Sequence, residues 1–377
     1  MRTLLPLAAL LLAGPVFGQT TWSVPAGGNL NSYIAQAAPG DVLLLAGTGS
    51  YFSVAVTKGV TILGNGASIY EASFQVPPGQ HASLADVSLP YMGPFGVNTI
   101  TITSGLVELS DIIHFGAAQF VVLGGSVVMQ RCWGGLSVAG GTCWVANSTI
   151  DGRPAISISG FGNWQSSPGI FQSGGEIYAS HCTVGGGGGA MESVPWPSYM
   201  GASAGLFQTA GIARLTDCTV TGGLGLGVPW PGEVAIFGAG NVSIARSTIA
   251  EGTFATTASS GFVEDSAMVG MESSGPPTVG ASFSITARFG SSQELVGLVC
   301  GFQRLTSILP PIVEPLFGDP AQLIVLLISP PPVGGSLTAP VAVPNVLSLR
   351  GSEVWLQALQ VDGATIRAST VVGGVIR

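Results

Sequence analysis

A glycine-led phrase of alternating apolar and polar residues recurs along the middle of the chain. The copies are GLVELSDIIHFG (105–116), GSVVMQRCWGG (125–135), GTCWVANSTIDG (141–152), GEIYASHCTVGG (175–186), GIARLTDCTVTG (211–222) and GNVSIARSTIAEG (240–252), with a shorter copy, GFVEDSAMVG, at 261–270. One copy is too small to bury its apolar side chains alone, so the copies must stack on one another. The phrase therefore predicts a solenoid in which each coil adds one layer to a shared core.

Each phrase alternates with a period of two on either side of a single break, which predicts a strand, a bend and a second strand. In the copy at 211–222 the break falls at Asp217. The equivalent positions in the other copies are Asp111, Arg131, Asn147, His181, Arg246 and Asp265. Asparagine and aspartate tolerate left-handed backbone, so we interpret this column as a structural bend and not as a catalytic cluster. His81 and His114 receive the same structural interpretation, because no partner set accompanies them.

The start of the chain predicts export. Residues 1–18 combine one arginine, an apolar run too short to span a bilayer, and small residues before Gln19, which is typical of a secretory signal peptide. After it, Leu30, Ile34 and Ala37 follow Asn29 at helical spacing. Such a helix can cover the exposed apolar end of a solenoid. We expect a secreted or cell-surface protein with an N-terminal cap helix and no membrane insertion.

The composition limits the classes of partner. Charged residues make up only 8% of the chain, hydrophobic residues 46%, and glycine numbers 57, a balance that favours many short strands and tight turns over disorder. With a net charge of −8 and Lys58 as the single lysine, the chain has no basic patch for nucleic acid. The cysteines lack metal-ligand spacing, so we expect neither a metal nor another cofactor.

Three of the five cysteines, Cys132, Cys182 and Cys218, share a column that otherwise holds mainly serine. A column of small residues usually faces inward, so we expect buried thiols that pack as small apolar groups. Cys182 and Cys218 would lie on successive coils about 4.8 Å apart, within backbone reach of a disulfide. The sequence leaves open whether they are bonded.

Residues 271–377 break the rhythm of the repeats. After the Gly275-Pro276-Pro277 break come alternating or apolar runs at 282–289, 295–302, 322–329, 336–344 and 354–361. Strands bounded by proline and glycine clusters predict a smaller antiparallel β-sandwich. We therefore divide the chain into residues 1–18, a solenoid at 19–270 and a C-terminal domain at 271–377. Because domain boundaries fall in exposed linkers, we expect this domain to fold apart from the solenoid.

The opening of the mature chain has a familiar pattern. Ala38-Pro39-Gly40-Asp41, Gly49 with Tyr51, and Lys58-Gly59-Val60-Thr61-Ile62 with Gly64 resemble the start of right-handed parallel β-helix proteins of the pectin-lyase-like superfamily. The later phrases resemble the coils of that superfamily. The resemblance covers about residues 20–270 and implies an all-β fold, a right-handed parallel β-helix. The ending around Trp355 and Asp362 resembles a C-terminal domain that recurs in secreted bacterial proteins.

Long insertions interrupt three successive coils just before Phe171, Phe207 and Phe237. Enzymes of the pectin-lyase-like superfamily bind polysaccharide along the first-strand face beside such loops, so the resemblance implies a glycan site here. Our candidate ligand-binding residues are Trp164, Trp196, Tyr199, Trp230, Gln172, Gln208, Glu192 and Glu233. Indole rings can stack on sugar rings, but the tryptophans can equally serve to pin the loops to the coil.

The expected groove does not offer the groups that cleavage needs. A calcium-dependent lyase needs clustered carboxylates and a basic residue, and a hydrolase needs two carboxylates that face one bond. The groove positions hold Gln172, Ser173, Gln208 and Thr209 instead. We therefore predict no catalytic residues and expect a non-catalytic surface or glycan-binding protein. A polysaccharide lyase or glycoside hydrolase, and a purely structural envelope protein, are the alternatives.

A second and fainter candidate is an outward column of the first strands, which holds Glu108, Val128, Trp144, Tyr178, Arg214 and Ser243. Tyr178 and Arg214 are expected to stack there as a cation–π pair, whose role is either structural or in binding.

Overall fold

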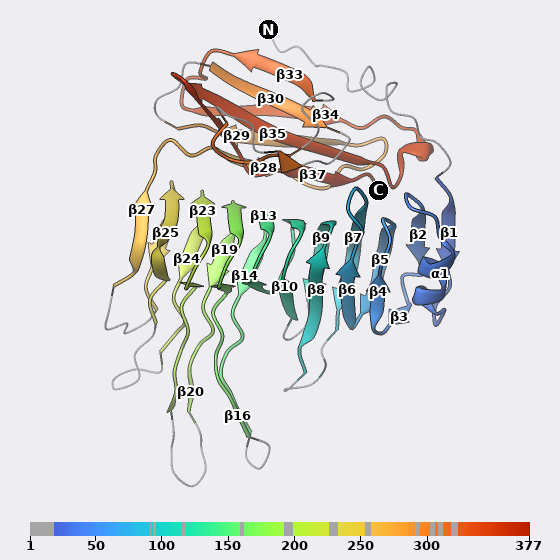
Figure 1. Ribbon diagram of the computed structural model, residues 1–377, viewed down its shortest axis with the longest axis horizontal. Helices are drawn as coiled ribbons and strands as arrows, with labels where there is room; N and C mark the ends of the chain where they lie inside the picture. The colour runs from blue at the N-terminus through green and yellow to red at the C-terminus, as the bar shows by residue number, and fades with distance from the viewer. Residues whose placement is uncertain are drawn as a thin grey trace.

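The computed structural model describes residues 19–377, except for residues 91, 93–95, 115–117, 159–161, 192–198, 226–232, 253–257, 291–294, 302–305, 308–311 and 318–322. Within these ranges the chain is nearly all β, with one short α-helix, α1 (Leu30–Gln36). A long parallel sheet winds into a right-handed parallel β-helix, and smaller antiparallel sheets follow it as a β-sandwich (Figure 1). The fold class predicted from the sequence is confirmed.

The coils of the β-helix present their strands on three faces, which we name A, B and C in chain order. Face A contains β1 (Thr21–Val24), β2 (Val42–Leu45), β11 (Ser126–Gln130), β13 (Thr142–Ala146), β18 (Glu176–Ser180), β23 (Ile212–Thr216) and the first halves of β5 (Thr61–Ile69), β7 (His81–Leu89) and β9 (Leu106–His114). Face B contains the second halves of these long strands, β3 (Ser50–Tyr51), β14 (Thr149–Asp151), β19 (Thr183–Gly185), β24 (Thr219–Thr221) and β26 (Thr248–Ala250). Face C contains β4 (Val54–Val56), β6 (Glu71–Gln75), β8 (Asn98–Ser104), β10 (Ala118–Val122), β12 (Gly135–Val138), β17 (Ile170–Gln172) and β22 (Leu206–Gln208). The last strands, β25 (Ile236–Ala245) and β27 (Ser260–Glu264), run from face C to face A.

Two columns of left-handed backbone bend most coils. Between faces A and B, the non-glycine residues with φ between 47° and 58° include Asn65, Asp86, Asp111, Arg131, Asn147, His181, Asp217 and Arg246, so the predicted bend column is confirmed at these positions. Between faces C and A, the glycine that opens each phrase, such as Gly141 at φ 75°, has the same handedness. Glycine adopts this conformation without steric cost, which explains why every phrase begins with it.

Asp265 departs from the predicted column. It is not among the residues with left-handed backbone, and its carboxylate binds Arg367 of the C-terminal domain at 2.9 Å instead of Arg246. Arg246 instead makes two hydrogen bonds of 3.0 Å to the Asp217 carboxylate. The bend column therefore forms ion pairs between some neighbouring coils. Its last member, Asp265, instead pairs with the C-terminal domain.

The cap helix α1 closes the N-terminal end of the β-helix, as predicted. Asn29 accepts a hydrogen bond from the backbone of Ser32 at the start of the helix, and Leu30 and Ile34 are buried. At its other end the Lys58 ammonium donates to carbonyl oxygens of the last turn. A charged group at this end complements the helix dipole, so this lysine has a structural partner.

The C-terminal domain consists of two main antiparallel sheets. One contains β28 (Gly270–Ser273), β29 (Ser282–Arg288) and β34 (Ser336–Ala342). The other contains β33 (Ile324–Ser329), β30 (Leu295–Gly301), β35 (Glu353–Asp362), β36 (Thr365–Ala368) and β37 (Val372–Val375). A short pair, β31 (Thr306–Ser307) and β32 (Leu316–Phe317), and a 3-10 turn, η2 (Leu347–Leu349), complete it. Each of the apolar runs predicted as a strand in this region contains a strand.

The sandwich lies along face A of the β-helix (Figure 1). Outward side chains of face A, among them Trp144 at 1% exposure and Val128 at 0%, are buried against Phe317 and Trp355 of the C-terminal domain. The Trp144 ring meets Phe317 edge-on at 5.2 Å. A domain that shares a core with the coil in this way is expected to unfold with it, so we revise our expectation that it folds apart.

Hydrogen bonds continue this interface along the coil. Ser83 donates to Glu353 at 2.6 Å, and the backbone of Met271 donates to Ser180 at 3.1 Å. The predicted Tyr178–Arg214 pair is present, with the guanidinium 5.8 Å from the ring centre, but Arg214 also binds Glu314 of the C-terminal domain. The outward column is therefore part of the domain interface, and its cation–π pair has a structural role.

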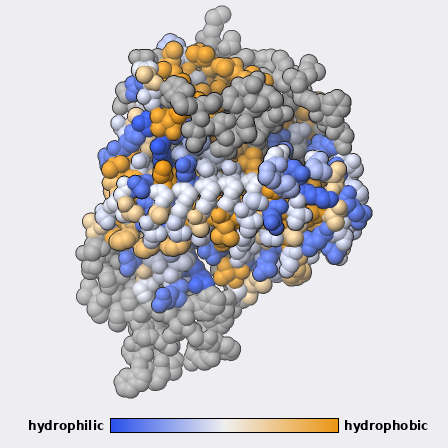
Figure 2. All heavy atoms as spheres, viewed as in Figure 1, coloured by the Kyte–Doolittle hydropathy of each residue, from blue (hydrophilic) through white to orange (hydrophobic). Residues whose placement is uncertain are grey.

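Hydrophobic and hydrophilic residues occupy different parts of the surface. In Figure 2 hydrophobic residues gather at the top of the molecule, over the part of the sandwich that carries β33, where Val325 and Ile328 are more than half exposed. Among the described residues, no helix is both long enough and apolar enough to cross a membrane.

Candidate functional site

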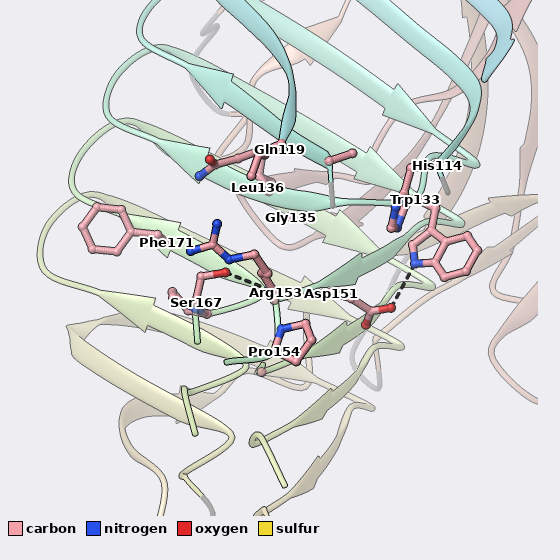
Figure 3. Close-up of a pocket in the computed structure, with 15 residues that line it drawn as sticks. His114, Gln119, Trp133, Gly135, Leu136, Asp151, Arg153, Pro154, Ser167 and Phe171 are labelled. Carbon is pink, nitrogen blue, oxygen red and sulfur yellow. Dashed lines mark hydrogen bonds between the residues drawn. The ribbon is translucent and has the colours of Figure 1, made fainter. Parts of the chain in front are cut away.

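A pocket of about 580 Å³ opens where face B ends and face C begins, beside the first long insertion. Its walls come from the end of β9, from β10 and β12, from the end of β14, and from the two ends of the loop that joins β14 to β17. Figure 3 shows Trp133 and His114 at one end of the pocket and Phe171 and Gln119 at the other, with Arg153 between them. Sites of this size, apolar with a few polar groups, are typical of small-molecule binding.

Trp133 is the most exposed large aromatic side chain of the pocket. It is 42% exposed, and its indole Nε1–H donates to Asp151 Oδ2 at 3.0 Å. The buried ring of His114 packs edge-on against it, with 4.5 Å between the ring centres. A side chain held by a hydrogen bond and by packing has little freedom left, so the exposed part of the indole is presented in one orientation.

Trp133 is also an exception in its column. It is paired with Thr149 of the next coil, and threonine continues the column at Thr183, Thr219 and Thr248. The two preceding coils hold Ser88 and Ile113 here, so Trp133 is the aromatic member of this column. This replacement is visible in the sequence and was the available signal for the pocket.

Arg153 brings a cationic group to the pocket from the start of the insertion. Its backbone N–H donates to Ser167 Oγ at 2.8 Å, and its guanidinium Nη2 donates to the carbonyl oxygen of Gln165 at 3.3 Å. Burial lowers the pKa of its guanidinium, but an arginine stays protonated at every physiological pH. These two bonds join both ends of the first insertion and hold the guanidinium at the pocket.

Phe171 forms the pocket wall on face C and begins a stack of aromatic rings. Its ring lies 5.9 Å from Phe207, which lies 5.1 Å from Phe237, with planes inclined by 15° and 10°. These spacings follow the coil repeat, because the three residues share one register position on successive strands. The rings cover one another's faces, so only Phe171 borders the pocket.

The acidic groups near the pocket are few. Among its described lining residues, Asp151 is the only acid, whereas hydrolysis of a glycosidic bond requires two facing carboxylates. Nor do the described parts of the chain contain a group of three or more histidine, cysteine, aspartate or glutamate side chains arranged to hold a metal ion.

The candidate residues chosen from the sequence divide into three groups. Trp196, Trp230 and Glu192 lie outside the described residues. Trp164 ends β16 (Gly162–Trp164), which pairs with β15 (Ile156–Ile158), and Tyr199 begins β21 (Tyr199–Met200), which pairs with β20 (Ala190–Met191); the orientation of these two side chains lies outside the description. Both hairpins extend away from the coil, opposite the sandwich (Figure 1).

Gln172 and Gln208 do not line a groove, which corrects our expectation. Both side chains are buried inside the coil, at 0% and 1% exposure. Gln208 Nε2 donates to Gln172 Oε1 at 3.0 Å, and Gln172 Nε2 donates to the carbonyl oxygens of Gly175 and Ile212. The two amide groups therefore bond to each other and to backbone carbonyl oxygens beside the glycine bend, and together they form a ladder inside the coil. Glu233 lies half-buried at the base of the third insertion, where its backbone bonds to Gly223 and Gly252.

Comparison with protein-family models, with curated protein sequences and with solved structures finds no match for this chain. Its function must therefore be inferred from the site itself.

Proposed function

We propose that this protein is an exported, non-catalytic β-helix protein of the pectin-lyase-like type that binds a saccharide in the pocket beside Trp133. The observation that carries the proposal is the exposed indole, oriented by Asp151 and His114 at the edge of a pocket of about 580 Å³. Indole rings stack on the apolar faces of sugar rings, and polar side chains around the ring supply hydrogen bonds to hydroxyl groups.

The remaining wall groups suit the same ligand. Gln119 offers an amide donor and an acceptor, Arg153 offers charged donors, and Asp151 retains acceptor capacity beyond its bond to the indole. Phe171 supplies an apolar wall opposite Trp133. A neutral or acidic sugar ring would find both stacking and hydrogen-bonding partners here.

A glycan array followed by titration calorimetry tests this proposal. Trp133→Ala is expected to weaken binding of the best ligand by about tenfold, because one stacked ring and its buried area contribute on the order of 1–2 kcal/mol. Phe52→Ala is the matched control, since Phe52 is also exposed but stacks on Tyr70 far along the coil. Binding that survives Trp133→Ala unchanged would reject the site, and a wild-type protein that binds no glycan would favour the structural envelope role.

A polysaccharide lyase is the second candidate, because His114, Arg153 and Asp151 border the same pocket. Proton abstraction beside a carboxylate needs a base and a cation that stabilises the developing charge. Incubation with pectate, alginate and related polymers, followed by ultraviolet detection of unsaturated products and by reducing-end assays, separates the two functions. Our proposal expects no product; product formation that is lost in His114→Ala would establish the enzyme.

A further inference from the structure

Two cysteines of the β-helix occupy neighbouring positions on successive coils. Thr183 and Thr219 are register partners on face B, so the residues that precede them, Cys182 and Cys218, are also paired. The backbone N–H of Thr219 donates to the carbonyl oxygen of Cys182 at 2.9 Å, which fixes this register. Neighbouring strands lie about 4.8 Å apart, inside the range of about 4.4–6.8 Å between Cα atoms that a disulfide spans.

The other cysteines do not share this arrangement. Cys132 lies two coils before Cys182, with Ser148 on the coil between them; the Ser148 hydroxyl accepts a hydrogen bond from the Cys132 backbone at 3.1 Å. Cys143 lies on face A, where its thiol contacts Met129 Sδ at 3.9 Å. Cys300 lies in the sandwich. All five are buried and free in this structure, but only Cys182 and Cys218 are register neighbours.

We propose that Cys182 and Cys218 are a cross-linking site, which closes to a disulfide when the protein folds in an oxidising compartment. Both side chains point into the coil, at 3% and 2% exposure, so neither must turn through the wall of the coil to reach the other. Burial raises the pKa of the Cys218 thiol well above its ordinary value, and the neighbouring Cys182 raises it further.

Oxidation removes only the weak hydrogen bonds that the two thiols donate. The Cys182 thiol donates to Ser180 O at 3.3 Å and the Cys218 thiol to Thr216 O at 3.3 Å. Each of these carbonyl oxygens also accepts a backbone N–H, from Asn147 and His181 respectively, at 3.1 Å. A thiol is a weak donor, so its loss leaves no buried carbonyl without a partner.

The oxidant is an external disulfide, such as oxidised glutathione or the disulfide of an oxidoreductase. The thiolate of one cysteine attacks it, releases one thiol and forms a mixed disulfide, which the second cysteine then resolves with release of the second thiol. The two cysteines together lose two electrons and two protons, and the external disulfide becomes two thiols. Because the folded coil buries both sulfurs, this exchange belongs to folding, and the finished bond is shielded from reduction.

The cross-link would join the two coils beneath the second insertion. The closed segment, residues 182–218, includes Gly186 of the pocket wall and the β20–β21 hairpin. Closing a segment of this length restricts the unfolded chain, so the oxidised protein is expected to melt roughly 5 °C or more above the reduced protein.

The test is to refold the full chain in oxidised and in reduced glutathione, quench with acid, alkylate free thiols under denaturing conditions, and measure intact and peptide masses. We expect three alkylated cysteines after oxidising refolding and a cross-linked peptide pair that contains Cys182 and Cys218. The Cys182→Ser variant should lose the bond, whereas Cys132→Ser should keep it. Serine already occupies this column at Ser148 and Ser247, so these variants keep the packing of the column. Five alkylated cysteines in the oxidised wild type, or a bond that maps to another pair, would overturn the proposal.

Discussion

The substitution Trp144→Ala tests whether the sandwich and the β-helix form one cooperative unit. The indole is almost fully buried between the two, where it meets Phe317 edge-on and lies parallel to Tyr178 at 6.1 Å. Truncation of a buried tryptophan to alanine costs about 3–5 kcal/mol, from lost burial and from the cavity left behind. If the sandwich were an independent domain that only rests on face A, most of this cost would vanish.

The assay is urea unfolding, followed by far-ultraviolet circular dichroism and by tryptophan fluorescence. We expect one coincident transition in the wild type and a fall of about 3–5 kcal/mol in the free energy of unfolding for Trp144→Ala. The control is Trp133→Ala on the preceding coil, because Trp133 is 42% exposed and lines the pocket instead of the interface. Its cost in free energy of unfolding should stay below about 1 kcal/mol. Equal effects of the two substitutions, or two separate wild-type transitions, would refute a shared core.

Three further predictions follow from the coil. Gln208→Leu should lower the free energy of unfolding by about 1–3 kcal/mol, because it leaves buried partners such as Gln172 unsatisfied; chemical denaturation beside the exposed control Thr209→Val measures this, and equal costs would contradict the ladder. Burial lowers the pKa of His181, more strongly than two neighbouring carboxylates raise it. The neutral imidazole is favoured in the folded protein, so its contribution to stability is complete above the unfolded pKa of about 6.5 and is lost as pH falls through the lower folded pKa. The urea midpoint of unfolding, measured from pH 8 to 5, should therefore fall less in His181→Asn than in the wild type. Equal falls in the two proteins would exclude the effect. Asn147→Val should cost about 1–2 kcal/mol and Asn147→Gly much less, since φ is 50° at this position; equal melting temperatures would rule out left-handed strain.

Much of the β-helix could be predicted from the sequence because local rules and the global fold agree there. The glycine at the head of each phrase and the Asp, Asn or Arg at its break mark the two left-handed bends, and the alternation between them marks the inward side chains. Stacking then repeats the same solution in every coil. The strands of the sandwich were equally readable, because proline and glycine bound each apolar run.

The position of the sandwich was not predicted, although the sequence carried a signal for it. Val128 and Trp144 are apolar at outward positions of face A, so their strands read as continuous apolar runs in place of an alternation. Strands buried on both faces show this pattern. Alternation on the other coils, with Glu108 and Arg214 at the same column, concealed it. Glu108 is buried and Arg214 is half-buried, and each is paired with the C-terminal domain.

The pocket escaped prediction for a different reason. Its residues come from several successive coils and from both ends of an insertion, and no repeated motif links them. The tryptophan-rich loops drew attention because two of them contain similar sequences, whereas Trp133 is a single aromatic residue followed by threonines on the next coils.

The way the last strands cover the middle of the coil sets an order on folding. Contacts between Ser83 and Glu353, and between Glu108 and the backbone of Val375, join residues 270 and 267 positions apart. During synthesis from the N-terminus, the coils can stack as each phrase is made, but Val128 and Trp144 stay uncovered until β35 to β37 are made. Such long-range closure is slow and leaves an apolar surface open to other chains in the meantime. The chain is therefore most prone to aggregate after its coil is complete and before its final strands cover face A.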